Sequence, residues 1–388
     1  MNDRSRISKP ARCMMLPTVA ILLLSAVSVH AQTMQVVDTP YYTLKTDLPA
    51  DRAKEAAIRV TKMFEEYQKR TSDFTRTVNR KLLFELHANR DTYVRSTDAP
   101  QTLGVYTGQR LVAYYQKNDA VETWHTVQHE GFHQFVDFAM GRDAIPIWAN
   151  EGLAEYFGES IWTGDRYYSG IIPQKRLERV QKKLKADEFR SLVSMLTMSH
   201  AQWNAEGNFN NYDQAWMMVH FLAHADNGKY AGAFGRFLGG ARTARSPEAW
   251  WISIFGNNVR AFEDRWREYW TNLPVHPTRI EQLEATCSTL TSFYARAFTE
   301  KQRYSDWGDF VADASRGLLK CEASEWLPPE LLQQALADAK KHGKWSIDKR
   351  PGKWFIVCAL EDGQRLEGSF KLSRGKVSSV DVALRKAR

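Results

Sequence analysis

The spacing of apolar residues changes twice along this chain. Before residue 120, alternating or short apolar runs predict strands at residues 34–46, 81–87, 104–106 and 110–116, and a 3.6-residue period predicts a helix over 50–70. The spacing is then helical as far as residue 342. After it, four alternating segments separated by turn residues predict a small antiparallel sheet. The chain is therefore expected to be an α+β protein.

The helical region opens with a segment whose ends are marked. Asp119 followed by Glu122 resembles a capping box, and Gly141 stands where a glycine commonly ends a helix. A second helix is predicted after Pro146. Further apolar periods predict helices at residues 177–184, 189–198, 213–224, 230–238 and 261–270, followed by a helical stretch over 278–342.

The first of these helices carries the sequence His129-Glu130-Gly131-Phe132-His133. Residues four apart share one face of a helix, so both imidazoles can reach one metal ion. Glu130 lies about 100° round the helix, where it can reach a water on that metal without binding the metal itself. This HExxH arrangement is known from zinc peptidases, with the glutamate as general base. A catalytic zinc takes three protein ligands, and Glu151 is the best candidate for the third.

Glu155 follows Glu151 by one helical turn. Because ligand histidines usually donate their second ring N–H to a carboxylate, we expect Glu155 to accept that bond from one of them. The alternative is that both glutamates only solvate the helix, but the residues around them are largely apolar. His125 lies eight residues before His133, a helical rise of about 12 Å, so it cannot share a metal with it. We interpret His125 as a packed or hydrogen-bonded side chain.

The segment Trp148-Ala149-Asn150-Glu151-Gly152-Leu153-Ala154-Glu155-Tyr156-Phe157, after the HExxH, resembles the gluzincin metallopeptidases. It is similar to the W-x-N-E-G-x-A segment of the M1 aminopeptidases. It is closer to the DUF1570 and peptidase MA-like proteins, whose HExxH is followed by P-x-W-x-x-E-G-x-A-E-Y-F. The resemblance covers roughly residues 34–225. The chain lacks one feature of the M1 enzymes, the G-A-M-E-N segment before the HExxH. Its absence argues against aminopeptidase activity.

This resemblance implies a thermolysin-like, two-lobe catalytic domain that binds one zinc ion. His129, His133 and Glu151 would be the zinc ligands, Glu130 the general base and Glu155 the support for a ligand. An edge strand ahead of the zinc helix could pair with an extended peptide.

A tyrosine or histidine normally helps the metal to stabilise the charge that develops on the carbonyl oxygen. Tyr212, at the start of the predicted helix 213–224, is our first choice, because DUF1570-like proteins show a similar Tyr-x-x-x-Trp segment. His220, inside that helix, is the rival.

The N-terminal sequence resembles a secretory signal peptide. Four basic residues precede the apolar run 14–29, and Val29-His30-Ala31 resembles a cleavage site. We therefore expect a periplasmic or secreted protein, with an uncleaved anchor as the alternative. Removing residues 1–31 takes away four basic residues and one acidic residue and lowers the formal net charge from +8 to +5. No nucleic-acid-binding module is recognisable.

A basic run is interpreted as a solvated helix face in preference to a site for an anionic polymer or membrane: Lys175, Arg176, Arg179, Lys182, Lys183 and Lys185. Three cysteines remain after residue 31, and in an oxidising compartment Cys287 and Cys321 are our choice for a disulfide, which leaves Cys358 free.

The predicted organisation has five parts: a signal peptide (1–31), an α/β upper lobe (32–120), a zinc-binding helical lower lobe (121–274), a helical extension (275–343) and a small β appendage (344–388). The predicted function is hydrolysis of peptide bonds in a peptide or protein substrate by a secreted or periplasmic zinc metallopeptidase. The alternatives are an M1-like aminopeptidase and a non-catalytic, zinc-bearing envelope protein that binds a partner.

Overall fold

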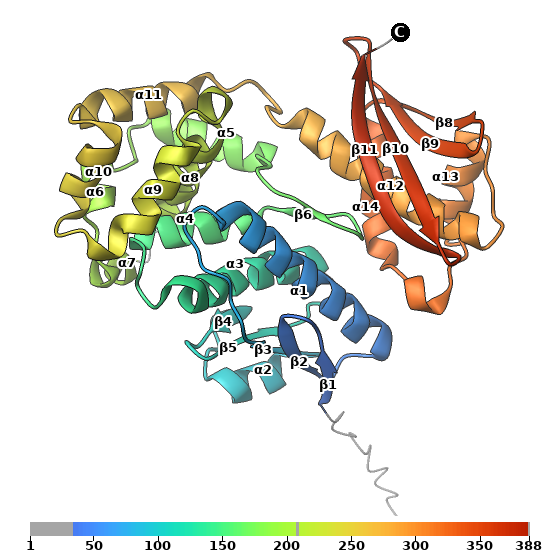
Figure 1. Cartoon of the computed structure of the whole chain (residues 1–388), viewed down its shortest axis with the longest axis horizontal. Coiled ribbons are helices and arrows are strands. Elements are labelled where there is room, and N and C mark those ends of the chain that lie inside the picture. Colours follow the sequence, from blue (N-terminus) through green and yellow to red (C-terminus); the bar gives the residue numbers. More distant parts are fainter. Residues whose placement is uncertain (1–33, 207–208, 387–388) are drawn as a thin grey trace, which may run out of the picture. The chain divides into compact units, whose positions relative to one another are not determined.

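The computed structural model describes residues 34–206 and 209–386 (Figure 1). The predicted signal peptide lies outside these described residues. Their fold is mixed α and β, with a mainly helical centre and an all-antiparallel sheet at the C-terminal end, as the sequence predicts. Within the described ranges, no helix has the length and apolar character needed to cross a membrane.

The N-terminal sheet has five strands in the order β1-β2-β3-β5-β4. The β2–β3 and β3–β5 pairs are parallel, and the two outer pairs are antiparallel. β4 is therefore an edge strand. The bounds are β1 (Gln35–Asp38), β2 (Tyr42–Thr46), β3 (Leu82–His87), β4 (Gly104–Tyr106) and β5 (Arg110–Tyr114).

The single strand predicted over residues 34–46 is wrong, because the chain forms two strands there. β1 and β2 pair as an antiparallel hairpin across residues 39–41. Thr39 makes the turn, since its hydroxyl oxygen accepts a hydrogen bond from the Tyr42 N–H at 2.8 Å. Pro40, with a fixed φ and no N–H, cannot continue a strand ladder through this point.

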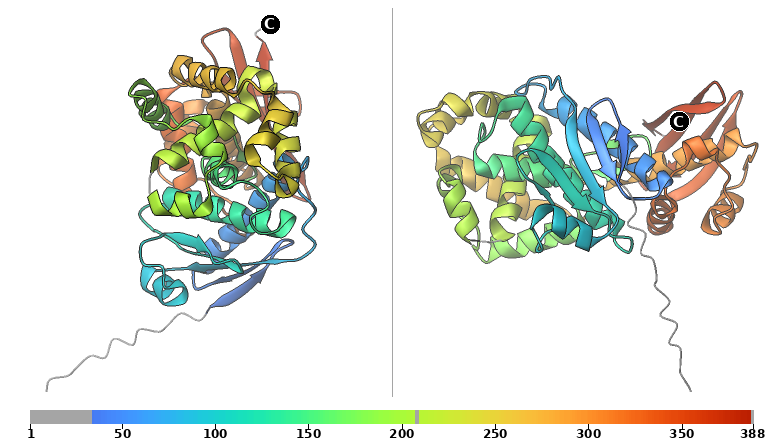
Figure 2. Two further views of the ribbon diagram at one scale, coloured as in Figure 1. Left: turned by 90° about the vertical axis from the view of Figure 1, so that its left-hand side faces the viewer. Right: turned by 90° about the horizontal axis from the view of Figure 1, so that it is seen from below.

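Two long helices cover one face of this sheet, and a short helix lies on the other (Figures 1 and 2). α1 (Ala50–Thr71) and α3 (Ala120–Met140) are the long ones, and α2 (Arg90–Thr97) is the short one. Aromatic rings fill the space between α1 and α3; Phe64 meets Phe135 edge-on at 5.3 Å between ring centroids. The face of α3 opposite its histidines is thereby fixed in the core.

The rest of the central region is helical apart from one short hairpin. α4 (Ile147–Gly158) is joined to α5 (Gln174–Lys185) through β6 (Ile161–Trp162) and β7 (Tyr167–Tyr168). The remaining helices are α6 (Leu192–Leu196), α7 (His200–Glu206), α8 (Phe209–Gly228), α9 (Ala231–Gly240), η1 (Ala241–Thr243), α10 (Pro247–Phe255) and α11 (Val259–Asn272). Helical geometry in α8 breaks at Ala225, one residue after its predicted end.

One predicted helix is much shorter than expected. The apolar pattern over residues 189–198 gives only α6, because the Ser191 hydroxyl caps the helix by accepting a hydrogen bond from the Ser194 N–H at 3.2 Å. A serine favours an N-cap over a helix interior, so it starts a new helix there. α2, α7 and α10 were not predicted.

The C-terminal elements pack into a hydrophobic cluster of their own. The helices are α12 (Arg279–Thr299), α13 (Trp307–Ser315), η2 (Ala323–Glu325) and α14 (Pro329–Lys341), and the sheet has the order β11-β10-β9-β8. Its strands are β8 (Lys344–Arg350), β9 (Lys353–Ala359), β10 (Gln364–Ser373) and β11 (Lys376–Lys386). Leu290 of α12 and Leu366 of β10 are fully buried in this shared cluster.

The predicted disulfide between Cys287 and Cys321 is absent. All three cysteines of the described ranges are free thiols. Cys287 is buried in the cluster and its thiol donates to the Ile356 carbonyl oxygen at 3.5 Å. Cys321 follows α13 and is only partly buried. The thiol of Cys287 is therefore directed toward the sheet, a contact that spacing in the sequence could not reveal.

Candidate metal centre

Local sequence fixes the two helices that carry the candidate ligands. The Asp119 carboxylate caps α3 by accepting the Glu122 N–H at 3.1 Å, and Gly141, with φ of 100°, ends it. Pro146 precedes α4 and Glu159 follows it. Gly152 allows α4 to approach α8 closely, because a Cβ atom at that position would lie 2.4 Å from the Ala215 carbonyl oxygen.

Three side-chain atoms from α3 and α4 converge on one point. Nε2 of His129 lies 3.1 Å from Nε2 of His133, and each lies 3.4 Å from Oε2 of Glu151. A tetrahedral zinc with bonds of about 2.1 Å separates its ligand atoms by about 3.4 Å. The three spacings thus match one face of such a tetrahedron. The three side chains are 13–14% exposed, and those of His133 and Glu151 line a cavity.

Second contacts orient both histidines for this role. Nδ1 of His129 lies 3.3 Å from Oε1 of Glu155, and Nδ1 of His133 donates to Oδ1 of Asn150 at 3.0 Å. With a proton on each Nδ1, both Nε2 atoms carry lone pairs. Oε2 of Glu151 is buried and accepts no hydrogen bond from a described residue. Three acceptors this close together require a shared cation or added protons, so the residues fit a metal ion.

The pKa values of the three candidate ligands are shifted in the directions that favour positive charge between them. Burial alone would lower the pKa of His129, but its contacts with Glu151 and Glu155 outweigh burial and raise it well above the ordinary value. The pKa of His133 is also raised, mainly by Glu151 acting against burial. Burial would raise the pKa of Glu151, but the two histidines lower it to about 2. The carboxylate is therefore ionised at neutral pH.

Glu130 lies beside the ligands and is held by the edge strand. Its Oε2 accepts the backbone N–H of Tyr106 in β4 at 2.8 Å. It lines a cavity of about 380 Å³ together with Tyr106, His133, Glu151, His200 and Asn204. A water or substrate carbonyl in this cavity would meet the Glu130 carboxylate and two of the candidate ligands at once.

Tyr212 lies near this group, whereas His220 has its contacts elsewhere. The Tyr212 ring is 6.5 Å from that of His129, and burial followed by Glu151 raises its pKa. His220 is buried against Trp216 and Trp270, and its Nε2 donates to the Gly170 carbonyl oxygen at 3.1 Å. Burial and His224 lower the pKa of His220 to about 3, so it stays neutral. Of the two rivals, only Tyr212 stands beside a candidate ligand.

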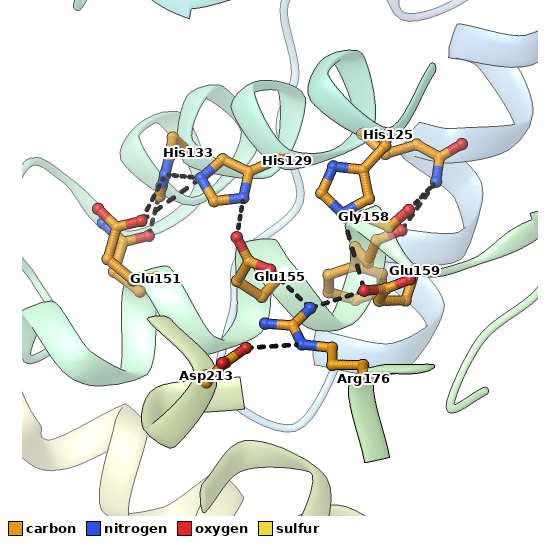
Figure 3. A network of polar contacts seen from close by, with 12 residues as sticks. His125, His129, His133, Glu151, Glu155, Gly158, Glu159, Arg176 and Asp213 are labelled. Carbon is orange, nitrogen blue, oxygen red and sulfur yellow. Dashed lines mark hydrogen bonds and ion pairs between the residues drawn. The ribbon is translucent and has the colours of Figure 1, made fainter. Parts of the chain in front are cut away.

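The other oxygen of Glu155 leads into a network of buried charges (Figure 3). Nη1 of Arg176 in α5 lies 2.7 Å from Oε2 of Glu155 and 2.7 Å from Oε1 of Glu159. Nε of Arg176 lies 3.2 Å from Oδ1 of Asp213 in α8. The prediction that the basic run of α5 is a solvated face is therefore wrong for Arg176, which is 7% exposed.

Asp213 also binds two other cationic side chains of the basic run in α5. Arg179 donates to both of its oxygens, and Nζ of Lys183 lies 2.9 Å from Oδ2. His125 is partly exposed, with Nε2 4.0 Å from Oε1 of Glu159, as expected for a histidine outside the metal group. It lines a separate cavity of about 690 Å³ that contains neither Glu130 nor any of the three candidate ligands.

Sequence reasoning missed three contributors to this site. Asn150 stands directly before Glu151, and its amide next to a predicted ligand was a usable signal. Arg176 was seen only as part of a charged run. The Tyr106 N–H had no signal at all, since a backbone donor is the same in every residue except proline.

A family model matches the part of the chain that carries the site. It is described as "Protein of unknown function (DUF1570)" and covers residues 123–239, less than a third of the chain. The matched segment runs from α3 to α9 and includes His129, His133, Glu151, Glu155 and Tyr212. The predicted similarity to DUF1570 is confirmed over these residues. No curated protein matches the sequence.

Proposed function

We propose that this chain is a zinc-dependent peptidase of the gluzincin type. The observation that carries the proposal is the spacing of three potential ligand atoms, 3.1–3.4 Å apart. A second carboxylate, that of Glu130, lines one cavity together with His133 and Glu151. His129, His133 and Glu151 would hold the ion, and Glu130 would remain free for acid–base chemistry. A protein that only bound zinc would need no carboxylate in that position.

The chemistry divides among the residues of the cavity. When bound, zinc would supply the positive charge that polarises the scissile carbonyl and acidifies a water. Glu130 takes the proton of the attacking water and passes it to the leaving amine. Tyr212 donates a hydrogen bond to the oxygen on which negative charge develops. The edge strand β4 offers backbone groups to an extended peptide, next to the Tyr106 N–H that orients Glu130.

The proposed substrate is therefore a peptide or protein, and the proposed location is the periplasm or the medium. The location rests on the basic and apolar pattern of residues 1–31. A fusion of residues 1–40 to a reporter enzyme that is active only after export would test it. An inactive fusion in exporting cells would contradict the assignment.

The function is tested with purified protein comprising residues 32–388, its Glu130→Gln variant and a Glu122→Gln control. Glu122 lies on the same helix but is exposed at its first turn. Each protein is incubated with a proteome-derived peptide library, new termini are read by mass spectrometry, and bound metal is measured. We expect cleavage by the wild type and the control, and a loss of at least about 100-fold in Glu130→Gln with its zinc retained.

Two other results would redirect the assignment. Cleavage confined to residues next to free amino termini would indicate an aminopeptidase. A wild type that binds one zinc ion and cleaves nothing would favour a binding protein. Cleavage by Glu130→Gln at the wild-type rate would contradict the mechanism.

A further inference from the structure

The described residues contain a second group of potential metal ligands, next to the first. One ligand atom from each of His125, Glu155 and Glu159 lies within 4.8 Å of the others. A cation already occupies this position, however, because Nη1 of Arg176 lies 2.7 Å from an oxygen of each glutamate. The group therefore binds the guanidinium of Arg176. The role of this contact depends on which side chains the guanidinium orients.

We propose that Arg176 is a positioning residue for the metal centre, acting on His129 through Glu155. This inference rests on the proposed function, since it assumes that His129 binds an ion. Glu155 divides its two oxygens: Oε1 lies 3.3 Å from Nδ1 of His129, and Oε2 lies 2.7 Å from Nη1 of Arg176 (Figure 3). Arg176 thereby fixes the carboxylate that keeps the proton of His129 on Nδ1 and the lone pair of Nε2 toward the ion.

Arg176 is itself rigidly held, as this role requires. Its guanidinium stacks over the Trp216 ring at 4.3 Å and contacts Asp213 as well as the two glutamates. The planar fork of arginine can serve all of these partners at once, whereas the single ammonium of a lysine cannot. The same side chain also joins α4 to α8, the helix that carries Tyr212.

The main test measures metal affinity, by competition with a chelator of known affinity, so that it does not depend on catalysis. Arg176→Met removes the guanidinium but leaves an unbranched side chain to pack on Trp216. We expect the affinity for zinc to fall about 10- to 100-fold, the usual cost of losing an outer partner of a ligand histidine. Arg179→Met is the matched control. It removes a cation from the same helix and from Asp213. Among the described residues Arg179 makes no hydrogen bond or ion pair with Glu155, so affinity should change less than about twofold.

A double-mutant cycle separates positioning from a general loss of structure. If Arg176 acts through Glu155, Arg176→Met should have almost no further effect on zinc affinity in a Glu155→Gln background. Equal losses in both backgrounds would overturn the proposal, as would wild-type affinity in Arg176→Met. If Arg176→Met does not fold, Arg176→Lys keeps the charge, and the same cycle is run with it. A smaller loss that disappears with Glu155→Gln is then expected, and equal losses overturn the proposal.

The visible spectrum of Co²⁺ bound in place of zinc gives a second readout, because it reports the geometry around the metal. The bands should move in Arg176→Lys and stay in place in Arg179→Met; unchanged bands in Arg176→Lys would overturn the positioning role. Failure of the inference can be told from failure of the proposed function. If the wild type binds neither zinc nor Co²⁺, both the proposed function and the positioning role of Arg176 are wrong. If the wild type and the Arg176 variant bind the metal equally well, only the positioning role is wrong.

Discussion

At the scale of single residues, the candidate site is built from acceptors that need a cation. Nε2 of His129, Nε2 of His133 and Oε2 of Glu151 lie within 3.4 Å of one another, while Glu155 and Asn150 take up the two Nδ1 positions. Such an arrangement is unfavourable in a partly buried place unless a proton or a metal ion is shared. Protons and a metal ion therefore compete for these acceptors.

Metal binding should weaken as the pH falls. In the metal-free protein the contacts with Glu151 raise the pKa of His129 and His133, so both hold protons at a higher pH than ordinary histidines. A metal ion must displace those protons, and lowering the pH adds to their competition. Calorimetric titration with zinc in buffers of different ionisation enthalpy should show protons released on binding at about pH 7, where an ordinary histidine would already be mostly neutral. Binding without proton release would contradict this account.

Asn150→Ala should lower zinc affinity about 10- to 100-fold, because His133 loses the acceptor that orients its ring. Asn204→Ala is the matched control. Asn204 lines the same cavity from α7 but makes no hydrogen bond to a candidate ligand among the described residues. Chelator competition measures both. If the two variants bind zinc equally well, Asn150 has no orienting role.

At the scale of elements, the site depends on how closely α4 and α8 pack. Gly152 directly follows the candidate ligand Glu151 in α4, and a Cβ there would lie 2.4 Å from the Ala215 carbonyl oxygen and 2.7 Å from Cγ2 of Val219. A backbone carbonyl cannot rotate away, so α8 would have to move. Since α8 carries Tyr212 and Asp213, the contact couples packing to the geometry of the site.

Gly152→Ala should therefore reduce the free energy of unfolding by about 1–3 kcal/mol, the usual cost of overpacking a buried contact. Gly232→Ala is the control: this helical glycine is exposed, and the nearest atom to its added Cβ would be 3.8 Å away. There alanine should be neutral or stabilising by up to about 1 kcal/mol. Urea denaturation monitored by circular dichroism compares them. Equal stabilities would show that α4 and α8 tolerate a wider separation.

At the scale of the whole molecule, the described residues form two hydrophobic clusters. One spans Tyr42 to Trp270 and includes the helices of the candidate site, and the other spans Leu283 to Leu366. The strands β9 and β10 contribute Ile356, Cys358 and Leu366 to the second cluster, whose α12 contributes Cys287 and Leu290. Because none of the candidate ligands belongs to the second cluster, changes in its interior should act on stability and leave the metal alone.

Leu366→Ala should lower the free energy of unfolding by about 2–5 kcal/mol, because this side chain is fully buried. Leu384→Ala, on the neighbouring strand and 42% exposed, should change it by less than about 0.5 kcal/mol. Zinc affinity should be the same in both variants as in the wild type. Denaturation and chelator competition provide the measurements, and a drop in zinc affinity for Leu366→Ala would show that the two clusters are coupled.

The sequence by itself determined the elements whose signals are local. The cap at Asp119, the stop at Gly141 and the i, i+4 spacing of His129 and His133 depend only on neighbouring residues, and α3 has the predicted bounds. The alternating segments after residue 343 likewise gave four strands. Local signals failed where a turn interrupted an apolar run, at Pro40 and at Ser191.

Only the tertiary structure decided which distant groups support the candidate ligands. The Tyr106 N–H reaches Glu130 from 24 residues away, and Arg176 of α5 reaches Glu155 of α4. The same positive charge can be solvated on one face of a helix or buried on another, and composition cannot distinguish the two. The shared helix face of His129 and His133 could be predicted from the chain because helix geometry is local. The approach of Glu151 from α4 and the supporting contacts depend on how separate helices and strands pack together.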